Sequence, residues 1–369
     1  MENLLVPTKV FIGENVVNKN ACEFNLGKKA FIVTGKSSGE KSGALKDVCD
    51  VLDALNIEYS VYNKINNNPT IEEVYEGGME AARENCDFII GIGGGSPLDA
   101  AKAVAVYAKN PVSEDFSLYD IFEDNFKNPP LPMIAVPTTA GTGSETTQYS
   151  ILTLHKEKNK KSFASKSVFY KKAFLDGKYN LNIPLYVARN TYVDALCHLI
   201  EGYTNKKSTA DTDKVAEIGL EIMGRFKENM LKGEFTREDC TNLLYGSMLA
   251  GCVIAHTGTT IVHSMGYPLT YYKGIAHGRA NGILLYEYMK RTNEVLPEKI
   301  NKVLKLSGFS SLDKVAEFLK SVLSLNEKID LNEIEEWTKT TIKAKNVLSC
   351  PFDVDYDKEV EMFKLCLEL

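Results

Sequence analysis

Short apolar runs alternate with amphipathic stretches along the first half of the chain. The apolar runs are rich in β-branched and aromatic residues and lie at 29–34, 58–62, 88–91 and 133–136. The amphipathic stretches lie at 45–55, 71–85 and 97–108. Strands that alternate with helices of about 12 residues are typical of βαβ units, whose strands read as continuous apolar runs because both faces are covered. We therefore predict an α/β, Rossmann-like parallel-sheet domain over residues 1–182.

A different pattern begins near residue 185. Long segments with a 3.6-residue period dominate, and strand-like runs largely disappear. The segments lie at 190–203, 209–228, 236–256, 311–324 and 331–345. This pattern predicts a second, all-helical domain over residues 183–369, with the domain boundary near Asn182–Pro184.

Composition and charge narrow the class of protein. Apolar residues make up 44% of the chain and charged residues 25%, which is usual for a folded protein and excludes intrinsic disorder. The 43 basic and 49 acidic residues give a formal charge of −6. Because the chain has no basic cluster that could neutralise phosphates, we expect no nucleic-acid partner.

Targeting and redox signals point to the cytoplasm. The N-terminus shows neither the cationic start nor the apolar run of a signal peptide. The stretch 243–255 is the nearest candidate for a membrane span, and it is shorter than the roughly 20 residues that a span needs. The eight cysteines form no CxxC pair and no regular framework. We expect a cytoplasmic protein with reduced thiols and no membrane partner.

A glycine-rich turn follows the predicted strand at 88–91. Glycines let backbone N–H groups approach an anion closely, and the N-terminus of the following helix adds partial positive charge. Proline is also suited to the first helical position. The segment predicts a phosphate or pyrophosphate site formed by Gly93, Gly94, Gly95, Ser96, Pro97 and Asp99. The spacing is not GxGxxG, and a tight turn needed only for packing is the alternative.

A second turn follows the strand at 133–136. It spans Pro137–Glu145 and is small and rich in hydroxyl groups, with Thr138, Thr139 and Thr142 as candidate cofactor contacts. Ligands of open α/β sheets bind at the carboxyl edge of the strands, where both turns are expected to lie. Two such turns suggest one extended ligand with phosphate groups. The alternative is a surface turn rich in Ser and Thr.

A third turn follows the strand at 29–34. It resembles the end of a P-loop, but that motif needs glycine at position 30, where the chain has Ala30, so we reject an NTPase. An acidic residue after an early strand commonly holds the ribose 2′-hydroxyl of NAD, whereas basic and hydroxyl groups accept the extra phosphate of NADP. The residues at this turn include no acid and favour NADP(H): Gly35, Lys36, Ser37 and Ser38.

Three of the five histidines lie in a pattern that suggests a metal site. Asp194 and His198 are four residues apart in a predicted helix, so both point from one face. His263 and His277 lie in an apolar, glycine-punctuated region. Three imidazoles and one carboxylate would satisfy a divalent ion such as Fe²⁺, Zn²⁺ or Mn²⁺. The alternatives are a hydrogen-bonded surface pair for Asp194 and His198, and satisfied core residues for the other two histidines.

Four motifs, in order along nearly the whole chain, resemble the iron-containing (group III) alcohol dehydrogenases. They are Gly93–Lys102, Pro137–Glu145, Asp194–His198 and His263–Gly278. The resemblance implies a nucleotide-binding α/β domain and a helical domain, related in fold to dehydroquinate synthase. It implies that Asp194, His198, His263 and His277 bind Fe²⁺, with Zn²⁺ possible, and that the turns hold the cofactor phosphates. It also implies that Lys160 lies near the nicotinamide side of the cofactor and that the protein is a homodimer.

The chain departs from the family pattern at two positions. Many members have Asp where this chain has Gly35, and that Asp enforces NAD, so this chain resembles the NADP-using, butanol dehydrogenase-like members. Many members also have a histidine four residues after the third ligand, where this chain has Tyr267. The proton relay is therefore open among Tyr267, His256, solvent and the cofactor ribose.

These features predict a metal-dependent alcohol dehydrogenase or aldehyde reductase. It would transfer hydride between NADP(H) and a small primary alcohol or aldehyde, with Fe²⁺ as Lewis acid on the substrate oxygen. One alternative is a polyol or polyol-phosphate dehydrogenase, or a dehydroquinate-synthase-like enzyme, which would need more basic residues than Lys273 and Arg279 near the ligands. A second alternative, a catalytically silent nucleotide-binding protein, is disfavoured because all four ligands are present.

Overall fold

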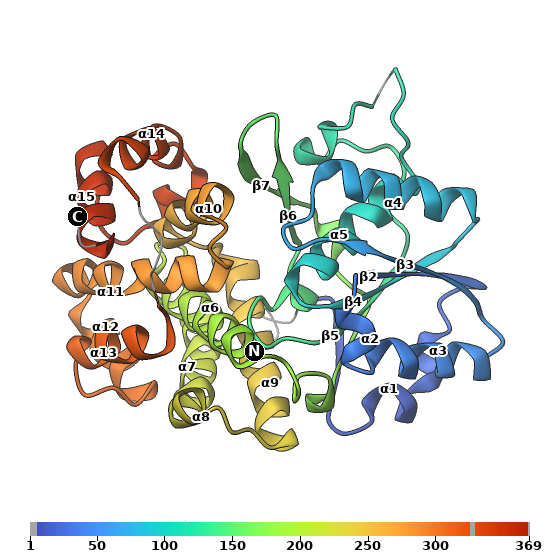
Figure 1. The fold of residues 1–369 in the computed structure, drawn as a ribbon, viewed down its shortest axis with the longest axis horizontal. Helices are drawn as coiled ribbons and strands as arrows, with labels where there is room; N and C mark the ends of the chain where they lie inside the picture. The colour runs from blue at the N-terminus through green and yellow to red at the C-terminus, as the bar shows by residue number, and fades with distance from the viewer. Residues whose placement is uncertain (1–5, 115, 325–328, 368–369) are drawn as a thin grey trace. The chain divides into compact units, whose positions relative to one another are not determined.

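The chain forms two compact units. The computed structural model describes residues 6–114, 116–324 and 329–367 (Figure 1). The described residues up to 183, together with 236–248, form a sheet unit, and those of 184–235 and 249–367 form a helical unit. The predicted helical domain included 236–248, which instead belongs to the sheet unit.

A six-stranded sheet organises the sheet unit. Its strands are β1 (Lys9–Ile12), β2 (Lys29–Gly35), β3 (Glu58–Ile65), β4 (Phe88–Gly93), β5 (Met133–Pro137) and β8 (Lys172–Leu175). Their order is β1-β8-β5-β4-β2-β3, and every neighbouring pair is parallel. This confirms the predicted parallel sheet. A separate antiparallel hairpin comprises β6 (Tyr149–Leu154) and β7 (Asn159–Ala164).

Helices cover both faces of this sheet. They are α1 (Val16–Lys19), α2 (Ser38–Lys41), α3 (Ala44–Ala54), α4 (Ile71–Arg83) and α5 (Gly95–Tyr107). The 3₁₀ helices are η2 (Ala21–Phe24), η3 (Asp120–Glu123), η4 (Ser144–Thr146), η5 (Lys166–Val168) and η6 (Gly177–Tyr179). Figure 1 shows α4 and α5 on one face, and α1, α2 and α3 on the other.

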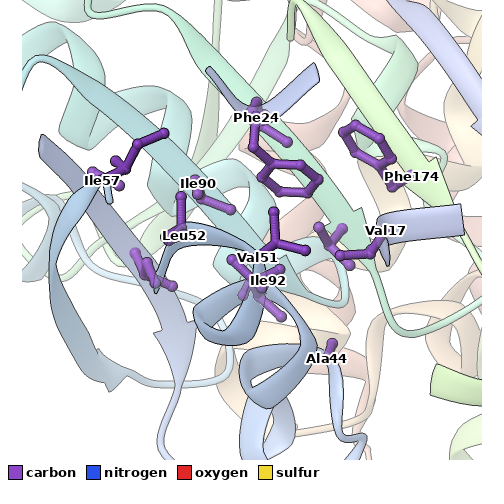
Figure 2. Packing of buried hydrophobic residues seen from close by; sticks show 14 of the residues in the cluster. Val17, Phe24, Ala44, Val51, Leu52, Ile57, Ile90, Ile92 and Phe174 are labelled. Atoms are coloured by element: carbon purple, nitrogen blue, oxygen red, sulfur yellow. The ribbon is translucent and has the colours of Figure 1, made fainter. Parts of the chain in front are cut away.

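The apolar runs of the strands form the core between these layers. Ile90 and Ile92 of β4 point toward α3, where they pack with Val51 and Leu52 (Figure 2). On the opposite face, a Cβ at Gly91 would lie only 3.0 Å from Cβ of Ala101 in α5. Because alternate residues of a strand point to opposite faces, burial on both sides explains the continuous apolar run that predicted β4.

The helical unit packs around two long helices. Its helices are α6 (Leu185–Thr204), α7 (Ala210–Gly224), α8 (Lys227–Lys232), the end of α9 (Arg237–Thr257), α10 (Ile261–Lys273), α11 (His277–Val295), α12 (Pro297–Leu306), α13 (Leu312–Val322), α14 (Leu331–Thr341), η7 (Lys345–Ser349) and α15 (Tyr356–Leu367). Helix α6 packs against α7 and α11, and α11 also contacts α10 and α15. No helix of the described residues is long and apolar enough to cross a membrane.

Two details of the predicted helices are wrong. The stretch 209–228 is not one helix, because α7 ends at Gly224, where a Cβ would meet the carbonyl oxygen of Leu306 at 2.7 Å. Helix α5 begins at Gly95, so Pro97 is its third residue and not its first. Proline is tolerated there because N–H groups in the first helical turn have no intrahelical partner.

An ion pair fixes the first half of α9 to the sheet unit. The guanidinium of Arg237 donates to both oxygens of Asp176 at 2.9–3.2 Å, and Asp176 is fully buried. The hydroxyl of Thr146 also donates to the carbonyl oxygen of Met248 at 3.1 Å. These contacts explain why residues 236–248 cluster with the sheet although they are helical.

A buried carboxyl group lies between the last two long helices of the helical unit. Glu359 of α15 is fully buried, and the hydroxyl of Thr341 in α14 donates to its Oε1. Its Oε2 has no hydrogen-bond partner within the described part of the chain. Burial raises the pKa of Glu359 to about 7, although the Thr341 hydrogen bond acts in the opposite direction.

We expect Glu359→Gln to stabilise the protein above neutral pH. In the unfolded chain the carboxyl ionises near pH 4.3, so the folded state loses stability as the pH rises from about 4 to about 7. The glutamine has no charge to bury, and its gain in unfolding free energy should grow across this window to about 2–3 kcal/mol. Thermal unfolding followed by circular dichroism from pH 5 to 8 measures this gain. The exposed Glu335→Gln on α14 is the control, and a gain independent of pH would contradict the account.

Candidate metal centre and nucleotide turns

Helix α6 carries two of the predicted metal ligands on its buried part. Every residue from Tyr192 to Thr204 is buried, so this half of the helix has no face in solvent. Asp194 is 2% exposed and His198 5% exposed. Their four-residue spacing puts both side chains on the same side of α6. The surface-pair alternative is therefore wrong.

Two further helices bring the other predicted ligands to the same place. His263 lies in the first turn of α10, and His277 is the first residue of α11. Nε2 of His263 is 2.9 Å from Nε2 of His198 and 3.9 Å from Oδ1 of Asp194. Nε2 of His277 is 3.8 Å from the same oxygen of Asp194. We call these four residues the ligand cluster.

The donor atoms of the ligand cluster fit a divalent ion. One atom each from Asp194, His263 and His277 lies within 4.8 Å of the other two. Imidazole nitrogens and carboxylate oxygens bind first-row ions at about 2.0–2.2 Å, so ligands of one ion are roughly 3–3.5 Å apart. The separations in the cluster are close to this value. Two imidazole nitrogens that face each other in a buried site also need a cation or a proton between them.

The carboxylate of Asp194 is held in its ionised form. Burial works to raise its pKa, but the nearby His198, His277 and His263 and a hydrogen bond from Asn281 lower it more, so the net shift is downward. An ionised carboxylate is the form that binds a metal ion.

The ligand cluster is surrounded by hydrogen-bonding partners that sequence reasoning missed. Glu201 of α6 accepts a hydrogen bond from Nδ1 of His263. Nδ2 of Asn281 in α11 donates to Oδ1 of Asp194 at 3.0 Å. Burial works to raise the pKa of Glu201, but the charge and hydrogen bond of His263 and two hydrogen bonds from Thr260 outweigh it, so the net shift is downward. A signal for Glu201 was present, since it follows Asp194 by seven residues and therefore shares its helical face.

The two candidates for the proton relay differ in their surroundings. The ring of Tyr267 stacks with that of His277, with 5.8 Å between the ring centroids. His256, in the last turn of α9, is exposed. Tyr267 therefore contacts a residue of the ligand cluster, whereas His256 faces solvent.

The first two glycine-rich turns touch each other in the sheet unit. Gly93 has φ +146°, a conformation that other residues rarely adopt. A Cβ at Gly94 would lie 2.8 Å from Oγ1 of Thr139, and one at Gly95 would lie 2.6 Å from Cγ2 of Thr142. The N–H of Thr138 also donates to the carbonyl oxygen of Gly93 at 2.9 Å. Because Gly94 and Gly95 have no side chains, Thr139 and Thr142 of the second turn can pack directly against the backbone of the first.

Asp99 is the fifth residue of α5, and its side chain forms hydrogen bonds that hold the neighbouring turn and strand β6. Its Oδ1 accepts from the hydroxyl of Ser144 at 2.6 Å, and its Oδ2 accepts from the N–H of Ile151 at 3.0 Å. Burial lowers the pKa of the neighbouring Lys102 to about 8, against the attraction of Asp99. Both oxygens of Asp99 are thus used inside the protein, and its predicted contact with the cofactor stays a prediction.

The third turn lies beside the first. A Cβ at Gly35 would be 2.7 Å from Oγ of Ser38 and 3.6 Å from Cγ of Pro97. Lys36, Ser37 and Ser38 are all exposed. Their donor groups are therefore accessible to a ligand at the carboxyl end of β2.

The hairpin and the loop before α4 meet the first turn. Lys160 of β7 is 7% exposed, and its Nζ donates to Oδ1 of Asn68 at 3.1 Å. The N–H of Asn68 donates to Oγ of Ser96 at 3.1 Å. Lys160 and Ser96, both predicted cofactor contacts, are thus joined through one asparagine.

Comparison with known proteins identifies the family. Residues 7–177 match the model of the iron-containing alcohol dehydrogenases, and residues 188–347 match the C-terminal model of that family. The chain belongs to the iron-containing alcohol dehydrogenase family. The resemblance inferred from four motifs is thereby confirmed.

Relatives and solved structures of this family cover most of the chain. Lactaldehyde reductase of Escherichia coli K12 is 30% identical over 82% of this chain and 80% of its own length. The NADPH-dependent butanol dehydrogenase of Clostridium saccharobutylicum is 29% identical over 83% of this chain and 79% of its own. The crystal structure of an iron-containing alcohol dehydrogenase from Thermotoga maritima superposes with a TM-score of 0.91 at 38% identity, covering 99% of each chain.

The close approach of α11 to α6 positions Asp194 in this iron-containing alcohol dehydrogenase. A Cβ at Gly278 would lie 1.9 Å from the carbonyl oxygen of Asn190 and 2.8 Å from Cβ of Asp194. We expect Gly278→Ala to push the helices apart, lowering stability by about 1–3 kcal/mol and the affinity for Zn²⁺ by at least about tenfold.

A chelator-competition titration of Zn²⁺ measures this loss. Gly274→Ala is the matched control, since no atom lies within 4 Å of the added methyl group and φ is +66°. It should cost about 1 kcal/mol of stability without changing Zn²⁺ affinity. Equal Zn²⁺ affinity in Gly278→Ala and the unaltered protein would show that this contact does not position Asp194.

Proposed function

We propose that this member of the family is an NADP(H)-dependent alcohol dehydrogenase or aldehyde reductase that uses Fe²⁺. Its substrates would be small primary alcohols and the corresponding aldehydes. The observation that carries the proposal is the convergence of Asp194, His198, His263 and His277 in a buried cluster whose separations suit one divalent ion. The predicted homodimer and cytoplasmic location stay predictions.

The side chains of the ligand cluster are suited to an ion that acts as a Lewis acid without changing its oxidation state. A bound divalent ion supplies a Lewis acid that polarises the substrate oxygen. The chain's own part is to hold the donors: Asp194 stays ionised, and Glu201 keeps Nε2 of His263 turned toward the cluster. The family name favours Fe²⁺, and Zn²⁺ shares the same ligand types.

The glycine-rich turns support binding of a dinucleotide. Helix α5 has thirteen residues, and its N-terminus follows directly on Gly94, so its N–H groups and dipole are suited to a phosphate. Thr138, Thr139 and Thr142 belong to the turn packed against it. We propose that Lys160, held by Asn68, contributes to the nicotinamide side of the site.

The turn after β2 supports NADP(H) over NAD(H). It has no carboxylate between Gly35 and Ser38, and it offers exposed hydroxyl and ammonium donors. These groups are suited to a ribose 2′-phosphate. The Clostridium saccharobutylicum relative is an NADPH-dependent butanol dehydrogenase, which agrees with this choice and with a short primary alcohol.

As the residue that relays the proton, we propose Tyr267 rather than His256. Its contact with the ring of His277 supports a position beside the ligand cluster, and His256 is exposed at a helix end. The polyol-phosphate alternative needs cationic side chains for the substrate phosphate. Lys273 does not favour it, because its ammonium pairs with Glu333 at 2.6 Å.

Removal of one ligand tests the proposed activity. Metal-free protein reconstituted with Fe²⁺ under anaerobic conditions should oxidise NADPH with butanal, and a chelator should stop the reaction. Changes around metal ligands cost about 10–100-fold, so His263→Ala should cost more than about 100-fold while NADPH binding persists. The exposed His155→Ala is the control. Full turnover by metal-free His263→Ala would refute the proposed role of the metal.

A charge placed after β2 tests the nucleotide preference. Gly35→Asp should raise the KM for NADPH by about tenfold or more and lower the KM for NADH, because a carboxylate repels the 2′-phosphate and accepts a ribose hydroxyl. Steady-state kinetics with both nucleotides measures the change. The control, Asn56→Asp, adds the same charge at an exposed position before the amino end of β3. An unaltered NADPH preference in Gly35→Asp would place the phosphate elsewhere.

A further inference from the structure

Glu201 is a fully buried carboxylate on the same helix as Asp194 and His198. Three hydrogen bonds reach it. The N–H and the hydroxyl of Thr260 donate to its Oε1 at 2.8 and 2.6 Å, and Nδ1 of His263 pairs with its Oε2. The donors come from the residue before α10 and from its first turn, so Glu201 joins α6 to α10 beside the ligand cluster.

The contact with Glu201 decides which nitrogen of His263 carries a proton. An ionised carboxylate only accepts hydrogen bonds, so Nδ1 of His263 must be the donor. A neutral imidazole with its proton on Nδ1 has a lone pair on Nε2. That nitrogen is the one 2.9 Å from Nε2 of His198 and 3.9 Å from Asp194. The ring is therefore fixed in the tautomer that a metal ion needs.

Glu201 also changes the charge of the site. Among the four residues of the ligand cluster, Asp194 is the only anionic side chain, and neutral imidazoles add no charge. A divalent ion would leave the buried cluster with one uncompensated positive charge. Glu201 supplies the second negative charge close to the ion, and it does so without occupying a ligand position.

Thr260 holds Glu201 independently of any ion. It precedes α10, where N–H groups have no intrahelical partner, and its N–H is satisfied by Glu201. Nδ2 of Asn346 donates to the carbonyl oxygen of Thr260 at 2.8 Å, which fixes Thr260 from the other side. The carboxylate is thus positioned before a ligand arrives.

We propose that Glu201 is a positioning residue of the metal centre, which fixes the Nδ1–H tautomer of His263 and supplies the charge that balances a divalent ion. This inference rests on the proposed function, because it presumes that the ligand cluster binds a metal. It differs from a purely structural role, in which Glu201 only ties α6 to α10. The two roles predict different metal affinities.

Glu201→Gln separates these roles. A glutamine offers one oxygen and one NH₂ group, so it can accept from Thr260 or from His263, but not from both. If the NH₂ group faces Nδ1 of His263, the imidazole must move its proton to Nε2 and loses the lone pair in the cluster. We expect the affinity of the metal-free protein for Co²⁺ to fall by about 10–100-fold, and the absorption spectrum of bound Co²⁺ to change.

The control is Glu359→Gln, the same exchange at another fully buried carboxyl group that accepts a threonine hydroxyl in the helical unit. It should leave Co²⁺ affinity and spectrum unchanged. Thr260→Val is a second variant, which keeps the charge of Glu201 and removes one of its three donors. It should lower Co²⁺ affinity by less than Glu201→Gln does.

Chelator competition, the Co²⁺ spectrum and thermal unfolding of the metal-free proteins together decide the outcome. A lower melting temperature with unchanged Co²⁺ affinity and spectrum, in both Glu201→Gln and Thr260→Val, would overturn the positioning role and leave the proposed function intact. Failure of the unaltered protein to bind Co²⁺ would overturn the proposed function as well. Lower affinity with a changed spectrum in Glu201→Gln, and a smaller loss of affinity in Thr260→Val, would support the positioning role.

Discussion

Two carboxylates and three imidazoles form a connected cluster inside the helical unit, in which each side chain lies within 3.9 Å of at least one other. Asp194 and Glu201 are almost completely shielded from water, and removing an uncompensated charge from water costs several kcal/mol. Hydrogen bonds from Asn281 and Thr260 offset part of this cost. In the proposed metal centre a divalent ion offsets the remainder, because one cation can bind the carboxylate of Asp194 and the facing imidazole nitrogens together. Helices α6, α10 and α11 bring these side chains together.

Close backbone packing gives both functional regions their geometry. In the helical unit, Gly278 lets α11 approach α6, and a Cβ at Gly266 would lie 2.2 Å from Oδ1 of Asn281. In the sheet unit, Gly94 and Gly95 let two turns meet at the start of α5. Glycine allows a close approach in each unit: of α11 to α6, which carry predicted ligands, in the first, and of two turns to each other in the second.

Sequence reasoning found the features that have a strong local pattern. The strand that became β4 was predicted because burial on both faces gives a continuous apolar run, and Asp194 with His198 because their spacing matches a helical turn. The four-residue strands β1 and β8 were missed because they are too short for such a pattern. Helix α10 was hidden by its internal Pro268, and Glu201 by its charge, which favours a surface position unless the partner Thr260 is known.

The account requires one divalent ion per chain, bound by the ligand cluster and needed for reduction of an aldehyde. Anaerobic titration of the metal-free protein with Fe²⁺, with NADPH oxidation by butanal as the readout, measures this requirement directly. We predict that the rate rises in proportion to added Fe²⁺ and reaches its plateau at one equivalent per chain. A rate that is already maximal without metal, or that stays at zero after one equivalent has bound, would contradict the account.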